Sequence, residues 1–199
     1  LLNNTIHSVK DVIKNSPFQL IGMVRHTNSN DPLLVAKNPR SAFTEMFRVI
    51  RTRVEFIAQR KKNIMIMITS GESGDGKTYF CTNLACIYGM ASPKTVLVDM
   101  DIRKPSIIQR FNIQQTNGVT NFLINECTLD DIIIKMPDVD FDFIPSGAVP
   151  PNCGELIRSE KLVDMFRELR SRYDYIIVDT SPIGIVADAY ALAMQADVN

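Results

Sequence analysis

The chain has 199 residues, of which 45% are apolar and 22% are charged, a composition typical of one globular domain with a sizeable core. Lys and Arg together number 22, as do Asp and Glu, so the overall charge argues against a nucleic-acid partner. No apolar run reaches the roughly 20 residues that span a bilayer, and no signal peptide opens the chain, so we expect a soluble fragment. The cysteines lie apart, without a C-x-x-C pair, and are expected to be reduced structural thiols of a cytosolic protein: Cys81, Cys86, Cys127 and Cys153.

Residues 1–37 mix short apolar groups with Asn, Ser and His, and they include a cluster of turn-forming residues at 28–32. This pattern predicts a linker or arm packed on the edge of a domain. Asn38-Pro39 then favours a helix cap and first turn, opening a helix through about Gln59. Its apolar residues form one stripe at helical spacing, namely Phe43, Met46, Phe47, Ile50, Val54 and Ile57.

From Asn63 onward, short runs rich in Ile and Val alternate with segments of helical periodicity. The strands are expected at 64–69, 96–99, 141–144 and 176–179, and the helices at 77–90, 119–125, 129–136 and 155–172. Strands of this kind are buried on both faces of a parallel sheet, since each crossover places a helix over the sheet. The pattern predicts an α/β, three-layer domain like that of phosphate-loop NTPases, with a mostly parallel sheet and helices on both faces.

The first expected strand runs into Gly71-Glu72-Ser73-Gly74-Asp75-Gly76-Lys77-Thr78, which matches the phosphate-loop pattern G-x-x-x-x-G-K-[ST]. Its glycines let the backbone N–H groups approach phosphates without a Cβ in the way. Lys77 is expected to reach the β- and γ-phosphates from the solvent edge of the sheet, and the Thr78 hydroxyl to ligate Mg²⁺. The motif therefore indicates a nucleotide site.

Two other expected strands end in carboxylates. Asp99 and Asp101, followed by Arg103, leave the second strand, and Asp179 leaves the last one. Ligands of such sheets collect at the carboxyl ends of the strands, and carboxylates two residues apart repel one another unless a cation lies between them. The plain alternative is that Asp99 caps a helix and that Arg103 is a surface charge.

These motifs resemble the bacterial tyrosine kinases (BY-kinases), the cytoplasmic ATP-binding domains of capsule and exopolysaccharide co-polymerases. The resemblance covers residues 38–199, through the phosphate loop, the D-x-D-x-R strand end and the last acidic strand. It implies that ATP and Mg²⁺ are the cofactors, that Thr78, Asp101 and Asp179 hold the metal, that Arg103 belongs to the nucleotide site and that Asp99 accepts the tyrosine proton. Cys153-Gly154 and Ser181 stand where the family commonly has Pro-Ser and Pro, changes that we expect to affect loop shape and not chemistry.

The same resemblance extends to assembly. Glu45, Arg48 and Arg51 match the E-x-x-R-x-x-R signature that the family uses to form rings, in which a neighbour's tyrosine-rich tail is the substrate. It also implies a transmembrane part on the same or a partner chain, with residues 1–37 as a juxtamembrane linker, and a cognate tyrosine phosphatase. The expected location is the cytoplasmic side of the bacterial inner membrane. The family continues beyond position 199 to a tyrosine-rich tail, so the C-terminal part of the 38–199 kinase domain is expected to be missing here.

Other nucleotide-binding classes fit less well. Glu72 stands where partitioning and division-site ATPases carry a second lysine, and iron–sulfur carriers need clustered cysteines. GTPases read guanine with N/T-K-x-D, and eukaryotic-type kinases carry H-R-D and D-F-G, none of which occurs. The residues alone leave three activities open: a tyrosine kinase that regulates polysaccharide synthesis and export, an ATP-driven assembly switch, and a plain ATPase. Likewise, Glu45, Arg48 and Arg51 could be a solvated face with weak pairs such as Glu45–Arg48 and Arg51–Glu55.

Overall fold

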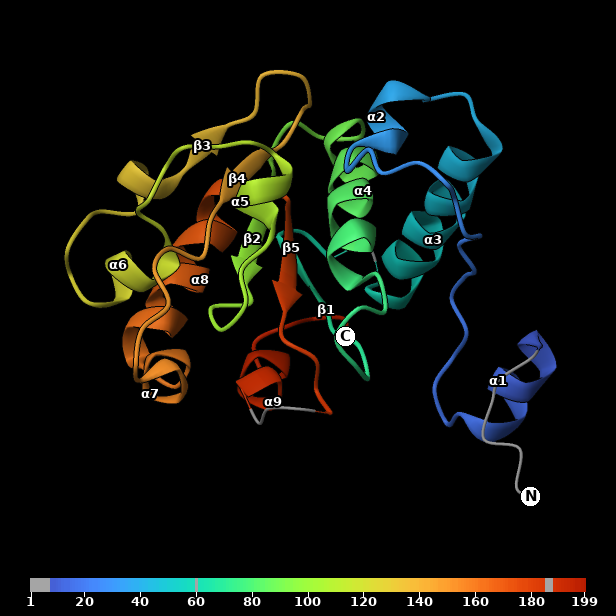
Figure 1. Cartoon of the computed structure of the whole chain (residues 1–199). Coiled ribbons are helices and arrows are strands. Elements are labelled where there is room, and N and C mark those ends of the chain that lie inside the picture. The colour runs from blue at the N-terminus through green and yellow to red at the C-terminus, as the bar shows by residue number, and fades with distance from the viewer. Residues whose placement is uncertain (1–7, 60, 185–187) are drawn as a thin grey trace.

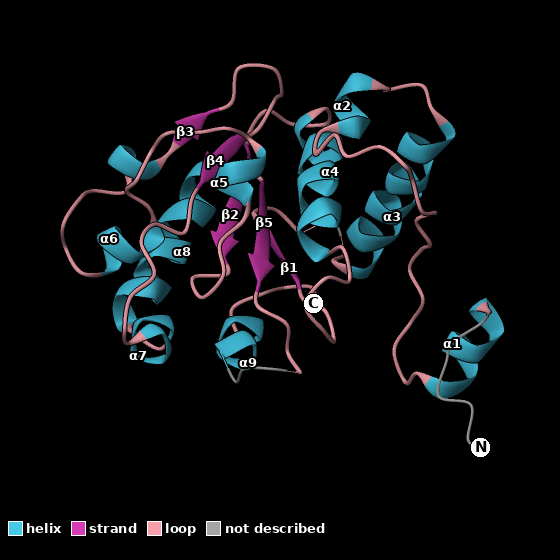
Figure 2. Ribbon diagram, viewed as in Figure 1, coloured by secondary structure: helices cyan, strands magenta, loops and turns pink. Residues whose placement is uncertain are grey.

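The structure is a computed structural model that describes residues 8–59, 61–184 and 188–199. Within these residues, five strands form one sheet in the order β1-β5-β2-β4-β3, parallel throughout except for the β3–β4 pair. Helices lie on both sides of the sheet (Figures 1 and 2), so the expected α/β architecture is confirmed. The strands are β1 (Ile64–Ile68), β2 (Thr95–Met100), β3 (Ile134–Lys135), β4 (Asp142–Ile144) and β5 (Tyr175–Thr180).

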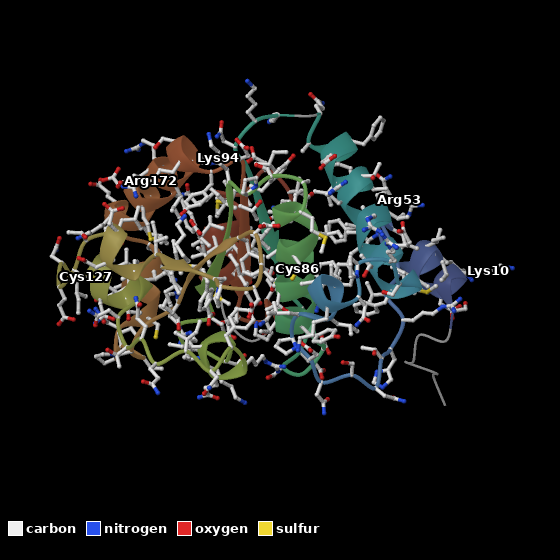
Figure 3. All side chains as sticks on the ribbon, turned by 90° about the horizontal axis from the view of Figure 1, so that it is seen from above. Lys10, Arg53, Cys86, Lys94, Cys127 and Arg172 are labelled. Atoms are coloured by element: carbon white, nitrogen blue, oxygen red, sulfur yellow. The ribbon has the colours of Figure 1, made fainter. Side chains whose placement is uncertain are left out.

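The helices divide between the two faces of the sheet and its carboxyl edge. In Figure 1, α3 and α4 lie on one side of the sheet, α6, α7 and α8 on the other, and α9 near the carboxyl ends of the strands. Figure 3 shows the same division, because Cys86 of α4 lies between Arg53 of α3 and Arg172 of α8. The helices are α1 (Val9–Asn15), α2 (Leu34–Lys37), α3 (Ala42–Ile57), α4 (Lys77–Gly89), α5 (Ile107–Arg110), α6 (Val119–Leu123), α7 (Cys153–Ile157), α8 (Glu160–Arg172) and α9 (Asp188–Ala193).

Alternation along the strands creates two cores. Ile64 and Ile66 of β1 pack with α3 and α4, whereas Met65 and Met67 pack on the side of α8. Successive side chains of a strand point to opposite faces, and both faces are covered, so the strand is apolar throughout. On β2, Leu97 points to the α4 side, and the positions two and four residues later in the chain continue on that side. Asp99 and Asp101 therefore lie on the α4 side of the sheet, whereas Met100 and Ile102 pack on the other side.

The helix expected from Asn38 to Gln59 is shorter. α3 begins after Ser41, whose hydroxyl accepts the N–H of Thr44 at 3.1 Å, and it ends at Ile57. Ser41 is the better cap because its side chain reaches an unpaired N–H of the first turn. Phe47, Ile50 and Val54 of the predicted stripe are buried, but Ile57 is 38% exposed. Its place in the core is taken by Ala58, at the end of the helix.

Two further expectations were wrong. Residues 129–136 form a short 3₁₀ turn, Asp130–Ile132, and the antiparallel strand β3 instead of a helix. The single helix expected at 155–172 is broken into α7 and α8 at Ser159, whose hydroxyl accepts the N–H of Leu162 at 3.3 Å. At 129–136 the pairing of β3 with β4 overrides the apolar pattern, and at 155–172 the capping hydrogen bond of Ser159 does so.

Part of the arm is built into the domain. Val35 of α2 is fully buried, and its N–H donates to the Asn83 side chain of α4 at 2.9 Å. The Asn83 amide in turn donates to the Pro32 carbonyl at 3.2 Å. Farther along the arm, Arg53 of α3 donates to the Ile21 carbonyl at 3.0 Å. The segment around residues 21–37 is therefore fixed to α3 and α4, whereas α1 lies away from the sheet in Figure 1.

The last described residues return to the sheet. Val198 forms a parallel bridge with Ile66 of β1, and the Asp197 carboxylate accepts the N–H of Met65 at 3.0 Å and pairs with Arg170 at 2.7 Å. The outer edge of β1 is thus partly paired. Among the described helices, none combines the length and apolarity that crossing a membrane requires.

Candidate nucleotide site

The phosphate loop connects the carboxyl end of β1 with α4. Gly74 and Gly76 have φ angles of +98° and +88°, in the left-handed region that residues with a Cβ rarely adopt. The Asp75 carboxylate accepts the N–H of Glu72 at 2.9 Å, which closes the loop on itself. No side chain caps α4, so the first N–H groups of this 13-residue helix face the loop. A helix N-terminus of this kind suits a phosphate group.

Two carboxylates are forced together at the neighbouring strand ends. β2 and β5 are adjacent, and their register places Asp99 opposite Asp179. Both side chains are buried, each only 1% exposed. Burial, and then the charge of Asp179, raise the pKa of Asp99 well above its usual value. Burial also raises the pKa of Asp179, against the opposing effect of Lys77.

Lys77 supplies positive charge at this point. Its Nζ lies 3.1 Å from Asp179 Oδ1 and 3.6 Å from Asp101 Oδ2. The side chain is only 9% exposed, so its expected place at the solvent edge is wrong: the first turn of α4 folds it over the strand ends. Burial alone would lower the pKa of Lys77, but Asp179 and Asp101 raise it above its usual value. Lys77 is therefore the counter-ion of Asp179 and Asp101.

Both oxygens of Asp179 have partners from α4. The Thr78 hydroxyl donates to Oδ2 at 2.7 Å, and the Cys81 thiol donates to Oδ1 at 3.4 Å. The sequence reading missed Cys81, although the spacing could have revealed it, because residues four apart on a helix share a face. Cys81 is buried and free, as are Cys86 and Cys153, and Cys127 is free and partly exposed.

Asp101 and Asp99 differ in how they are held. Oδ1 of Asp101 accepts the Ser181 hydroxyl at 2.7 Å and the N–H of Lys104 at 3.2 Å. Ser181, which the sequence reading limited to loop shape, therefore contacts a predicted metal ligand. Asp99 Oδ1 accepts the N–H of Asp101 at 3.1 Å, whereas its buried Oδ2 has no hydrogen-bond partner among the described residues. Asp99 lies deeper in the sheet than Asp101.

A cavity of about 240 Å³ opens in front of these groups. The predicted site residues that line it are Ser73, Gly74, Gly76, Lys77, Thr78 and Asp101. Those that do not are Gly71, Glu72, Asp75, Asp99, Arg103 and Asp179. Lys104 and Arg110 do line it, and the sequence reading did not single them out, although both follow the acidic strand end. The lining residues are Ser70, Ser73, Gly74, Gly76, Lys77, Thr78, Tyr79, Asp101, Lys104, Ser106, Arg110 and Pro182. The lining thus combines the positive charges of Lys77, Lys104 and Arg110 with the carboxylate of Asp101.

These residues fit ATP and Mg²⁺. Within the described residues, no three His, Cys, Asp or Glu side chains form a self-sufficient metal cage. Mg²⁺ in phosphate-loop sites needs fewer protein ligands than such a cage provides, because it is held by a hydroxyl, one or two carboxylates, phosphate oxygens and water. Thr78, Asp101 and Asp179 offer that donor set, and the close approach of Lys77 to both carboxylates shows that the cluster accommodates a cation.

The predicted assembly residues lie on α3, remote from this cluster in the chain. Arg48 pairs with Glu45 and donates to the Pro39 carbonyl at 2.8 Å. Arg51 pairs with Glu55 at 3.5 Å and donates to the Ile87 carbonyl of α4 at 3.1 Å. Both intrahelical pairs of the plain alternative are therefore present. Arg51 also ties α3 to the end of the helix that carries Lys77.

Comparisons with known proteins give one consistent result. A family model described as an AAA domain matches residues 62–198. The chain is 35% identical to the protein named "Putative tyrosine-protein kinase CapB" of Staphylococcus aureus, over 86% of this chain and 75% of CapB. It is 33% identical to the tyrosine-protein kinase YwqD of Bacillus subtilis, over 83% of this chain and 70% of YwqD.

Solved structures of similar fold agree with these sequence comparisons. The crystal structure of the chimerical protein CapA2B2 is 33% identical and superposes with a TM-score of 0.88, covering 95% of this chain and 82% of that one. The septum site-determining protein MinD of Pyrococcus horikoshii, complexed with Mg-ADP, is more distant, at 25% identity and a TM-score of 0.57 over 67% of this chain and 54% of its own.

We predict that Lys77→Met destabilises the nucleotide-free protein in a pH-dependent way. Without the lysine, the pKa of buried Asp179 rises further above that of an unfolded aspartate. At low pH Asp179 is protonated and the variant keeps most of its free energy of unfolding; as the pH rises, Asp179 must ionise without a counter-ion and this stability is lost. Removing one partner of a buried pair costs about 3 kcal/mol or more. Urea denaturation should show this deficit at pH 8 and a smaller one at pH 5.

The matched control is Asp179→Asn in the Lys77→Met background, which removes the charge that Lys77 balances and should recover part of the lost stability at pH 8. A deficit of equal size at both pH values, unaffected by the second substitution, would show that Lys77 stabilises the protein only through packing of its stem.

Proposed function

The chain belongs to the bacterial tyrosine kinases, and on this basis we propose that it transfers the γ-phosphoryl group of ATP to the hydroxyl of a protein tyrosine. One observation carries the proposal: the phosphate loop delivers Lys77 to Asp101 and Asp179 at the carboxyl edge of the sheet. Phosphoryl transfer requires little covalent chemistry from the protein, since positioning and charge stabilisation supply most of the acceleration. The site contains the groups for both.

The roles follow from position. Lys77 and the loop N–H groups bind the β- and γ-phosphates, and Lys104 and Arg110, on the cavity wall, add positive charge. Thr78, Asp101 and Asp179 hold Mg²⁺ directly or through water, and the metal, when bound, neutralises charge that develops on the phosphate oxygens. We assign Asp99 as the acceptor of the tyrosine proton, reached through water because it lies behind the cavity wall. Arg103 is exposed and lies outside the lining of this cavity, so it belongs to the proposed nucleotide site through the family resemblance alone.

The rival activities use the same residues. An assembly switch would bind ATP without transferring phosphate to protein, and a plain ATPase would use water as acceptor. The two relatives named tyrosine-protein kinases, each matched over 70% or more of its length, support transfer to tyrosine. The polysaccharide pathway, the inner-membrane location and the transmembrane and phosphatase partners are part of the proposal through the family resemblance.

Acceptor tyrosines are scarce in the chain itself. Tyr88 is fully buried with its ring tilted against that of Tyr175, and the Tyr173 hydroxyl donates to Asp142 at 2.7 Å. Tyr190 of α9 is 63% exposed. The acceptor of the proposed reaction is therefore a tyrosine-rich segment supplied by another molecule, or by chain beyond position 199. A ring in which Glu45, Arg48 and Arg51 meet the neighbouring subunit would bring such a segment to the site.

We predict that the chain, with Mg²⁺ and ATP, phosphorylates a tyrosine-rich peptide in trans while modifying itself little. Tyr190 is the exposed tyrosine, whereas Tyr79 and Tyr175 are part-buried and Tyr88 and Tyr173 are buried, so any self-modification should fall on Tyr190. A phosphotyrosine blot of the peptide, with the same reaction in EDTA as control, measures the transfer. ATP hydrolysis with an unmodified peptide would establish the ATPase instead, and high occupancy at several tyrosines of the chain would refute the acceptor assignment.

We predict that Asp179→Asn and Asp99→Asn fail for different reasons. Asp179 contacts Thr78 and Lys77, so its loss should raise the Mg²⁺ concentration needed for ATP binding by about 10-fold. Asp99→Asn should leave ATP affinity unchanged and lower turnover by roughly 10²-fold or more. Two measurements distinguish the defects of the two variants: the Mg²⁺ dependence of binding of a fluorescent ATP analogue, and the rate of peptide phosphorylation. Identical titrations would abolish this division of roles.

We predict that charge reversal at Arg48 lowers the oligomer mass and leaves ATP binding by the monomer unchanged. Light scattering of an assembling form should show the loss for Arg48→Glu. The pair swap Glu45→Arg/Arg48→Glu restores the intrahelical pair but still presents reversed charge to a neighbour, so it should not restore assembly. Lys94→Glu is the control, because Lys94 is exposed and lies away from α3 in Figure 3. An unchanged mass for both α3 variants would make this surface a solvated face.

A further inference from the structure

We infer that Ser181 is a positioning residue, whose hydroxyl fixes the Asp101 carboxylate in the orientation that offers one of its oxygens to Mg²⁺. Ser181 Oγ donates to Asp101 Oδ1 at 2.7 Å, and Ser181 is buried. The inference rests on the proposed Mg²⁺–ATP site and gives a role to Ser181, which stands where the family commonly has Pro.

The sheet register brings the two residues together. Met100 pairs with Thr180, so Asp101 and Ser181 each follow one residue later on adjacent parallel strands. Side chains two residues apart share a face, which places Ser181 on the same side as Asp179 and Asp101 on the same side as Asp99. The contact is therefore a consequence of β2–β5 pairing and does not depend on a mobile loop.

The backbone that carries Ser181 is held on both sides. Its carbonyl accepts the Thr69 hydroxyl at 3.1 Å and the Thr180 hydroxyl at 3.2 Å. Two residues on, the Ile183 N–H donates to the Ser70 carbonyl at 3.0 Å, which ties this segment to the start of the phosphate loop. A donor on such a fixed segment can impose an orientation on the group that it contacts.

Asp101 needs this constraint. The second torsion of an aspartate side chain has a broad, nearly two-fold preference, so its carboxylate turns freely unless hydrogen bonds hold it. Ser181 and the N–H of Lys104 both contact Oδ1, which leaves Oδ2 facing Lys77 at 3.6 Å. Without the hydroxyl, the hydrogen bond to Oδ1 that remains in the described residues is the 3.2 Å contact with the Lys104 N–H, beside the 3.6 Å ion pair of Oδ2 with Lys77. Asp179, in contrast, is held on both oxygens by Thr78 and Cys81.

Partners that orient a metal ligand affect metal affinity by about 10- to 100-fold when they are removed. The test is Ser181→Ala, which deletes the donor, beside Ser181→Thr, which retains it. Binding of a fluorescent ATP analogue is titrated with Mg²⁺ and repeated in EDTA. Ser159→Ala is the control, because this serine caps α8 far from the site, so its loss reduces thermal stability without touching Asp101.

We expect Ser181→Ala to need about 10-fold more Mg²⁺ for half-maximal nucleotide binding, with unchanged binding in EDTA. Ser181→Thr should bind with the Mg²⁺ dependence of the unsubstituted chain, as should Ser159→Ala despite its lower melting temperature. The inference is overturned if Ser181→Ala titrates like the unsubstituted chain, if it weakens binding equally in EDTA, or if the threonine variant behaves like alanine. An unsubstituted chain that binds no nucleotide with Mg²⁺ overturns the proposed function as well.

Discussion

The juxtaposition of Asp99 and Asp179 on adjacent parallel strands is the constraint on which the rest of the site depends. The two carboxylates are in register, point to the same face of the sheet and are almost inaccessible to water. Such a pair persists only if one group holds a proton or if a cation lies beside it. The phosphate loop meets this need by placing Lys77 at the start of α4, 3.1 Å from Asp179.

The same arrangement allows one cluster to serve both roles that the proposed function requires, metal binding and nucleotide binding. In the nucleotide-free protein Lys77 balances Asp101 and Asp179. In the proposed function these carboxylates would hold Mg²⁺ and Lys77 would bind the phosphates of ATP, so the lysine would exchange one set of anions for another. The remaining donors need not move: Thr78, Cys81 and Ser181 already hold the carboxylates from fixed elements.

Helix α4 connects this cluster to the rest of the molecule. Its first turn carries Lys77, Asn83 in its middle holds the arm at Val35, and the Ile87 carbonyl near its end accepts Arg51 of α3. The helix is buried over most of its length, so these contacts are fixed relative to one another. The arm, the proposed assembly surface and the nucleotide site therefore share one rigid element.

The sequence alone determined the architecture and the ligand class, because strands buried on both faces and a phosphate loop leave patterns that depend on neighbouring residues only. It could not place the break at Ser159 or the strand β3, since each depends on a capping contact or a partner strand. The contact of Ser181 with Asp101 lies 80 positions apart in the chain and exists only because β2 and β5 pair in one register. The burial of Lys77 was likewise decided by tertiary structure, because α4 folds over two strand ends whose charges it must balance.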